Sequence, residues 1–452
     1  MRYITGRAHV CVRARVLTAT VLLAAMLPAF IGLAPTAGAA SAPKDGPDSA
    51  FYHSTGSTPL HDIAPGTVLK SRTFTYWGLM WPVTVDQLLY RSTDALDRPT
   101  VNVTSVLHPT GWFPQHDRAV VMATAYDSLD VHDEPSVAIA NDIGFANDNV
   151  GGLLAKGLTV IVPDTEGQDA EMTAGRVYGR NTLDAIRATM NASSITGLDH
   201  GARMALSGYS GGAWAAMWAA QLAPSYAPDV NAKLVGVTVG GLPVNAAHIS
   251  EYLSGSLAFA AELPTAIIGL ARAYDVDFRP YLSPLGVELY DKYQHSSLGE
   301  AMFDLTFTHL GLKMSDLLKP QYADPNTIAD YVRIVNDNNL GTTGAATIPV
   351  QIVQGATGWT LGTADHPTLG NGDGATLTGD VRTLARQFCA AGTRVDYTQL
   401  DGNDHLSAYG TWANRSASWI DARLAGSVAP STCGSIAPGN SLAPEQLVPS
   451  GA

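Results

Sequence analysis

The stretch that decides the fold is ARMALSGYSGGAWAAMWAAQL, residues 202–222. Its first six residues are mostly apolar and predict a buried parallel strand, whereas Ala213 to Leu222 is alanine-rich without glycine or proline and predicts a helix. Between them, Gly208-Tyr209-Ser210-Gly211-Gly212 fits G-x-S-x-G. This motif in a sharp turn from strand to helix is typical of a nucleophile elbow, whose glycines allow strand and helix to cross closely. We therefore predict Ser210 as the nucleophile, the alternative being a turn of small residues with an ordinary serine.

Apolar segments alternate between strand and helix patterns along much of the chain. Strands are expected at 101–107, 118–125, 157–163, 233–239, 348–353 and 394–400, and helices at 181–191 and 381–389. Asn181 is the expected cap of the first of these helices. The alternation predicts a mostly parallel sheet covered by helices on both faces. Together with the elbow it predicts an α/β protein with the α/β-hydrolase fold.

About a hundred residues separate the expected strands 233–239 and 348–353, far more than the ~2–6 of an ordinary loop. The pattern there is helical at 252–274, broken by Pro264, and again at 298–318. We expect residues 241–345 to form a helical cap over the carboxyl edge of the sheet, the alternative being an independent packing subdomain. An acyl-binding channel above Ser210 is expected to use some of the cap's apolar residues, Leu253, Leu257, Phe259, Ile267, Ile268 and Leu270.

The hydrolase core is accordingly expected in two parts, 40–240 and 346–433, followed by an irregular tail, 434–452, rich in proline, glycine and serine. At the other end, four arginines, an apolar stretch at 16–33 and Ala37-Gly38-Ala39 predict a signal peptide over residues 1–39. A retained membrane anchor is the alternative. The signal peptide predicts a secreted, extracellular protein.

Net charge and cysteine content limit the partners, covalent links and metal sites expected of this protein. Loss of the leader, with four arginines and no acidic residue, lowers the formal charge from −13 to −17. This acidity argues against nucleic acid and anionic membranes as partners and favours neutral substrates. We also expect a monomer without stable membrane insertion. Cys11 lies in the leader, and Cys389 and Cys433 predict one disulfide, with two buried thiols as the alternative. No C-x-x-C or H-x-x-x-H spacing occurs, so no metal site and no cofactor is expected.

A nucleophilic serine requires an imidazole to take its proton and a carboxylate to orient that imidazole. In α/β-hydrolases these residues follow one another in the order Ser, Asp or Glu, His. His405, in an expected loop after strand 394–400, is the candidate base. The acid should follow strand 348–353, where Asp373 is the preferred candidate and Asp365 the alternative.

The oxyanion of the reaction requires two backbone N–H donors. Gly211, the residue after the candidate nucleophile, provides one by the construction of the elbow. The loop after the expected strand 118–125 offers Asp127 for the second. A His-Gly-Gly-Gly motif is absent from the sequence.

Six short motifs occur together in this chain: RSTDA at 91–95, AYDS at 125–128, GYSGG at 208–212, PVQIVQG at 349–355, CAAG at 389–392 and GNDHL at 402–406. In this combination the chain resembles the secretory lipases typified by Candida antarctica lipase A. The resemblance implies a capped α/β-hydrolase that uses Ser210, an acid and His405 to hydrolyse carboxylic esters, from short esters to triacylglycerols. It also implies an oxyanion hole made by the N–H groups of Asp127 and Gly211.

The chain departs from the pattern of this family in two places. No acid stands directly after the strand at 348–353, and a longer loop reaches Asp373 instead. One family disulfide has no counterpart, because Asp133-Glu134-Pro135-Ser136 replaces the usual cysteine-containing stretch, whereas Cys389 and Cys433 match the other. The expected ligand is a lipid or small ester. An acyltransferase or peptidase on the same fold, or a non-catalytic binding protein, are the alternative functions.

Overall fold

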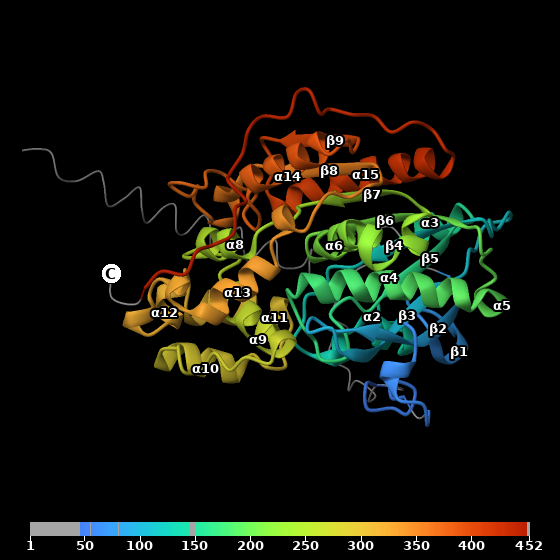
Figure 1. The fold of residues 1–452 in the computed structure, drawn as a ribbon, viewed down its shortest axis with the longest axis horizontal. Coiled ribbons are helices and arrows are strands. Elements are labelled where there is room, and N and C mark those ends of the chain that lie inside the picture. The colour runs from blue at the N-terminus through green and yellow to red at the C-terminus, as the bar shows by residue number, and fades with distance from the viewer. Residues whose placement is uncertain (1–45, 55, 80, 145–149, 450–452) are drawn as a thin grey trace, which may run out of the picture.

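The computed structural model describes residues 46–54, 56–79, 81–144 and 150–449, so the expected signal peptide lies outside the described residues. The centre of the described chain is a nine-stranded sheet with the strand order β1-β2-β3-β5-β4-β6-β7-β8-β9 (Figure 1). Its strands are β1 Val68–Tyr76, β2 Val83–Thr93, β3 Pro99–Leu107, β4 Arg118–Ala123, β5 Thr159–Pro163, β6 Arg203–Tyr209, β7 Leu234–Gly240, β8 Val350–Gly355 and β9 Val395–Leu400.

Strands β4 to β9 pair in parallel, and β1, β2 and β3 add antiparallel pairings at one edge. The predicted α/β-hydrolase class with a mostly parallel sheet is confirmed. Strands β1 and β2 were not expected from the sequence. β2 is buried along nearly its whole length, yet it contains Asp86, Gln87 and Arg91. Buried polar residues remove both the alternation and the continuous apolar run by which a strand is recognised.

Helices cover both faces of the sheet (Figure 1). Alternate residues of β4 show this, because Val121 packs into one core with α4, α6 and α14, whereas Val120 packs into another with α3 and α15. The helices of the body are α2 Pro135–Ala140, α3 Val150–Ala155, α4 Gly175–Asn191, α5 Ser193–Thr196, α6 Gly211–Tyr226, α7 Pro228–Asn231, α14 Thr378–Ala390 and α15 His405–Leu424.

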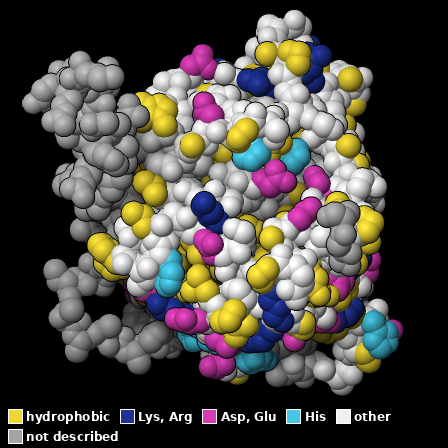
Figure 2. Space-filling model, turned by 90° about the vertical axis from the view of Figure 1, so that its left-hand side faces the viewer, with side chains coloured by type: hydrophobic (Ala, Val, Ile, Leu, Met, Phe, Trp, Pro, Cys, Tyr) yellow, Lys and Arg dark blue, Asp and Glu magenta, His cyan; other side chains and the backbone are white. Residues whose placement is uncertain are grey.

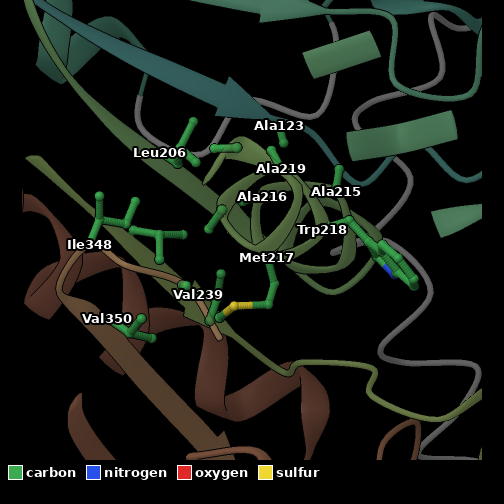
Figure 3. Packing of buried hydrophobic residues seen from close by; sticks show 14 of the residues in the cluster. Ala123, Leu206, Ala215, Ala216, Met217, Trp218, Ala219, Val239, Ile348 and Val350 are labelled. Atoms are coloured by element: carbon green, nitrogen blue, oxygen red, sulfur yellow. The ribbon is translucent and has the colours of Figure 1, made fainter. Parts of the chain in front are cut away.

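Helix α6 lies close against the sheet because alanines form much of its buried face. Figure 3 shows Met217 of this helix beside Val239 of β7, with Val350 on the neighbouring strand β8. The expected start of α4 was wrong, since this helix begins at Gly175 and Asn181 lies inside it. The side chain of Asn181 accepts a hydrogen bond from the Ser92 hydroxyl at 2.7 Å instead of capping a helix.

The segment between β7 and β8 is helical, as expected, and gathers at one end of the sheet (Figure 1). It contains α8 Ala246–Leu253, α9 Glu262–Tyr274, α10 Pro284–Lys292, α11 Leu298–Thr308, α12 Met314–Leu317 and α13 Ala329–Asp337. Short 3-10 turns lie at Leu60–Asp62, Val131–Asp133, Pro320–Tyr322, Pro325–Thr327, Leu340–Thr342 and Gly358–Leu361. The expected break at Pro264 was wrong, because this proline lies in the first turn of α9, where its missing N–H needs no partner.

The cap helices share a core of their own, to which Met172 and Val177 of the body also contribute. Figure 2 looks onto this end of the molecule and shows hydrophobic side chains scattered among acidic and basic ones. No helix among the described residues has the length and apolar character needed to cross a membrane.

The C-terminal tail has no helix or strand between 434 and 449, yet it is packed against the body. Ile436 and Leu442 are buried, and Asn440 donates a hydrogen bond from Nδ2 to Asp380 Oδ1 of α14 at 2.7 Å. The predicted disulfide between Cys389 and Cys433 is confirmed, with a Cα–Cα distance of 5.5 Å. The tail is thereby fixed to α14 at the position where the chain leaves the body.

Candidate active site

Ser210 occupies the turn between β6 and α6 with φ 54° and ψ −122°, a backbone conformation that residues other than glycine rarely adopt. Two glycines make this turn possible. A Cβ on Gly208 would lie 2.1 Å from the carbonyl oxygen of Gly212, and a Cβ on Gly212 would lie 2.1 Å from the carbonyl oxygen of Ala123. Any side chain at either position would therefore force β4, β6 and α6 apart.

The structure brings Ser210, His405 and Asp373 into one hydrogen-bonded chain. Ser210 Oγ lies 2.8 Å from His405 Nε2, and His405 Nδ1 lies 2.9 Å from Asp373 Oδ2. Asp373 is completely buried and His405 is 1% exposed. Asp365, the alternative acid, is exposed and makes no recorded hydrogen bond with His405 within the described chain.

Asp373 is oriented by several donors besides His405. Its Oδ1 accepts hydrogen bonds from the backbone N–H groups of Ala375 and Thr376 at 3.0 and 2.8 Å. Its Oδ2 accepts a third from Gln354 Nε2 at 2.9 Å. Gln354 was not anticipated from the sequence, although its place near the end of β8 puts it where polar residues gather in this type of sheet. These bonds leave the carboxylate of Asp373 one orientation, toward His405.

His405 is the first residue of α15, so its placement in a loop was wrong. Asp404 directly precedes the helix as its N-cap residue, and its side chain accepts a hydrogen bond from the N–H of Ser407 at 2.7 Å. The imidazole lies near two aromatic rings, with centroids 5.2 Å away at Tyr209 and 5.6 Å away at Phe259. A Cβ on Gly241, whose φ is 54°, would come within 2.6 Å of His405 Cε1. The imidazole of His405 fits at this position because Gly241 has no side chain.

Asp127 lies beside the elbow with φ 39°, a second strained position at this edge of the sheet. The backbone N–H groups of Asp127 and Gly211 donate no recorded hydrogen bond to another described residue. A Cβ on Gly211 would lie 2.0 Å from Asp127 Oδ1, so the two residues are in close proximity. Burial raises the pKa of the Asp127 carboxyl to about 6, and the charge of His405 partly offsets that increase. Two unpaired N–H groups beside a serine are the arrangement that an oxyanion hole requires.

The loop that carries Asp127 is anchored on both sides by Glu166, which sequence reasoning missed. Glu166 Oε2 accepts the N–H of Ser128 at 3.1 Å, and the N–H of Glu166 donates to the Tyr126 hydroxyl at 2.7 Å. The Tyr178 hydroxyl donates to Glu166 Oε1 at 2.6 Å. Burial, followed by the charge of Asp127, raises the pKa of Glu166 well above its usual value. An acidic residue just after the buried strand β5 was the available signal.

An apolar pocket of about 1220 Å³, including its opening to solvent, extends from Ser210 and Gly211 into the cap. Three of the residues expected to line an acyl channel lie on the wall of this pocket, namely Leu253, Ile267 and Leu270. Leu257, Phe259 and Ile268 are not on its wall. Within the described residues, no group of three or more His, Cys, Asp or Glu side chains is arranged to hold a metal ion.

Residues 136–432 match the family model described as secretory lipase. The chain belongs to the secretory lipase family. It is 36% identical over 197 residues to Lipase 1 of Candida albicans, covering 42% of this chain and 41% of that protein. It is 34% identical over 266 residues to the Trichothecene C-3 esterase of Fusarium sporotrichioides, covering 56% and 58% of the two chains. The relatives of this chain thus include a lipase and an esterase.

Two further comparisons extend over most of the chain. A probable inactive lipase of Mycobacterium tuberculosis is 29% identical over 381 residues, or 80% of this chain and 79% of that protein. The structure of Candida antarctica lipase A in its closed state superimposes with a TM-score of 0.72 at 23% identity, covering 88% of this chain and 91% of that one. The chain spans less than half of the length of Lipase 1.

Proposed function

We propose that the enzyme cleaves carboxylic esters through an acyl-enzyme formed on Ser210. The observation that supports this mechanism is the hydrogen-bonded chain from Ser210 Oγ through His405 to Asp373, with distances of 2.8 and 2.9 Å. A serine hydroxyl is a weak nucleophile unless a base accepts its proton as the new bond forms. His405 Nε2 accepts that proton, and Asp373 holds the imidazole in the required tautomer and stabilises the resulting imidazolium.

The first step forms a bond between Ser210 Oγ and the ester carbonyl carbon and places a negative charge on the carbonyl oxygen. The N–H groups of Gly211 and Asp127 donate hydrogen bonds to this oxyanion. His405 then returns the proton to the leaving alcohol, which departs and leaves the acyl group on Ser210. A water molecule repeats the sequence, with His405 taking its proton, and releases the carboxylic acid.

The acyl chain of the substrate occupies the apolar pocket between Ser210 and the cap. Apolar walls stabilise alkyl chains by about 0.8 kcal/mol for each buried methylene, which favours lipid or small aliphatic esters. We further propose that the enzyme acts outside the cell as a monomer. The family description, the signal-peptide pattern at 1–39 and the disulfide between Cys389 and Cys433 support export.

The proposal is tested by replacing Ser210 with alanine and measuring the hydrolysis of p-nitrophenyl butyrate. We expect Ser210→Ala to lower kcat by about 10⁴-fold or more while the melting temperature stays close to that of the wild type. Ser207→Ala is a matched control, because this buried serine lies three residues away on β6 and Ser210, not Ser207, is hydrogen-bonded to His405. Retention of a tenth of the activity by Ser210→Ala would rule out the mechanism.

A further inference from the structure

Most polar side chains on the wall of the pocket already have hydrogen-bond partners in the protein. Ser250 Oγ and the Tyr331 hydroxyl lie 2.9 Å apart, and Thr376 Oγ1 accepts a hydrogen bond from Gln354 Nε2 at 2.9 Å. The Tyr178 hydroxyl donates a hydrogen bond to Glu166 Oε1. These groups keep their hydrogen-bond partners when an apolar acyl chain fills the pocket, so they need no hydrogen bond from the substrate.

Two carboxyl groups on the same wall differ from these side chains. Glu262, in the first turn of α9, and Asp127 line the pocket, and neither side chain makes a recorded hydrogen bond within the described chain. The indole N–H of Trp214 also has no partner there, but its nitrogen is closed off within the wall. The carboxyl groups are therefore the unpaired polar groups that a substrate can reach.

Glu262 lies near the end of the pocket where the reaction takes place, because its N–H donates to the carbonyl oxygen of Phe259 at 3.0 Å and the ring of Phe259 lies 5.6 Å from the imidazole of His405. Burial, with the charges of Asp127 and Asp373 in addition, raises the pKa of Glu262 to about 8. At neutral pH its carboxyl is therefore protonated and can both donate and accept a hydrogen bond. The side chain of Glu262 is partly buried on the wall of a pocket that opens to solvent, so water can pair with it in the free enzyme. A substrate that displaces this water without supplying a partner loses a hydrogen bond, whereas one that supplies a partner keeps it.

We propose that Glu262 is a specificity-determining residue that binds a hydroxyl group on the alcohol part of the ester. The acyl chain occupies the apolar remainder of the pocket, which leaves the alcohol part beside the polar end. A hydroxyl-bearing alcohol, such as a partly esterified polyol, gives the carboxyl of Glu262 a partner, whereas a plain alkyl alcohol leaves it unpaired. This inference rests on the proposed function and assigns a substrate class to the same site.

The test compares two esters that share the acyl chain and a three-carbon alcohol, glycerol monobutyrate and propyl butyrate. We expect wild-type kcat/KM to be higher for glycerol monobutyrate. Glu262→Met, which keeps the length of the side chain without its polar atoms, should lower the ratio of the two values about tenfold, the effect of losing one good hydrogen bond. Glu262→Gln should retain part of the ratio, because an amide also donates and accepts. Glu288→Met on α10, an exposed position outside the pocket, is the control and should keep the wild-type ratio.

A ratio in Glu262→Met within twofold of the wild type would overturn the proposal, as would a wild-type preference for propyl butyrate. A preference for butyrylcholine over glycerol monobutyrate would also overturn it, because the site would then select a cation. If Glu262→Met does not fold, the ratio is measured in Glu262→Ala instead. A ratio in Glu262→Ala within twofold of the wild type, or a wild-type preference for propyl butyrate, then overturns the proposal. Failure of the proposed function is distinguishable, since wild-type enzyme would then hydrolyse neither ester.

Discussion

The strand ends of the sheet and the wall of the cap form two sides of one pocket, and the carboxyl groups of Asp373 and Glu262 in these two regions differ in their hydrogen bonds. At the strand ends, the Asp373 carboxylate accepts hydrogen bonds from His405, Gln354 and two backbone amides. On the cap side, the carboxyl of Glu262 has no recorded hydrogen bond within the described chain. The sheet side therefore holds reacting groups in fixed orientations, whereas the cap side leaves a polar group to be paired by the substrate. We infer that the body determines the chemistry and the cap determines the choice of ester.

The largest effect should come from the acid on the sheet side. We expect Asp373→Asn to lower kcat by about 10⁴-fold, because asparagine no longer holds His405 in the tautomer that accepts a proton from Ser210. The decrease in kcat is measured by steady-state hydrolysis of p-nitrophenyl butyrate. Asp365→Asn is the matched control from the same loop and should stay close to the wild type. Comparable losses in both variants would mean that the acid of the proposed triad is wrongly assigned.

A smaller effect should follow when the support of the oxyanion loop is weakened. Tyr178→Phe removes the hydroxyl that donates to Glu166, which in turn holds the N–H of Ser128 next to Asp127. We expect kcat to fall about tenfold with little change in KM, because the oxyanion develops during the reaction and is absent from the bound ester.

Tyr90→Phe provides the matched control for that variant. Its hydroxyl is also buried and donates a hydrogen bond at 2.8 Å, but to the carbonyl oxygen of Asn181 away from the pocket. Both variants should lose about 1 kcal/mol of unfolding free energy, and Tyr178→Phe alone should lose turnover. Equal kcat in the two variants would show that Glu166 has no positioning role.

On the cap side, a bulkier residue should change the choice of acyl chain more than the chemistry. Ile267 lines the pocket, so Ile267→Phe should lower kcat/KM for octanoate esters several-fold, because each excluded methylene forfeits about 0.8 kcal/mol. Acetate esters, whose acyl group ends near Ser210, should be hydrolysed nearly as well as by the wild type. A chain-length series of p-nitrophenyl esters measures both. A decrease in kcat/KM of the same size for all chain lengths would show that the acyl chain does not bind next to Ile267.

The smallest predicted effect is a change in how the stability of the folded protein depends on pH. Burial, together with nearby acidic residues such as Asp169, raises the pKa of Glu171 to about 8, whereas in the unfolded chain it titrates near its ordinary 4.5. The folded state therefore binds this proton more tightly, and the associated stability is lost as pH rises from about 4.5 to 8. Melting temperatures at pH 5 and pH 9 should differ less in Glu171→Gln than in the wild type. An unchanged difference would contradict the raised pKa.

The features predictable from the sequence are those that depend on local geometry. The elbow at Ser210 requires glycine at 208 and 212, and the order of serine, acid and histidine follows from the sheet. The acid was harder to choose, because the loop after β8 must fold back before Asp373 meets Gln354. The start of α15 at His405 and the buried polar strand β2 have no comparable local signature. Glu166 is marked in the sequence only by its position just after β5, and the role of Glu262 depends on tertiary neighbours that no spacing in the sequence reveals.

The central claim, that Ser210 carries the acyl group, is tested most directly by locating a covalent label. Wild-type enzyme inactivated with diethyl p-nitrophenyl phosphate should carry one diethylphosphoryl group on the peptide that contains Ser210, in proportion to the activity lost. The Ser210→Ala variant should remain unlabelled under the same conditions, and Ser207→Ala should be labelled like the wild type. Complete inactivation with Ser210 unmodified, or with the label on another residue, would contradict the mechanism.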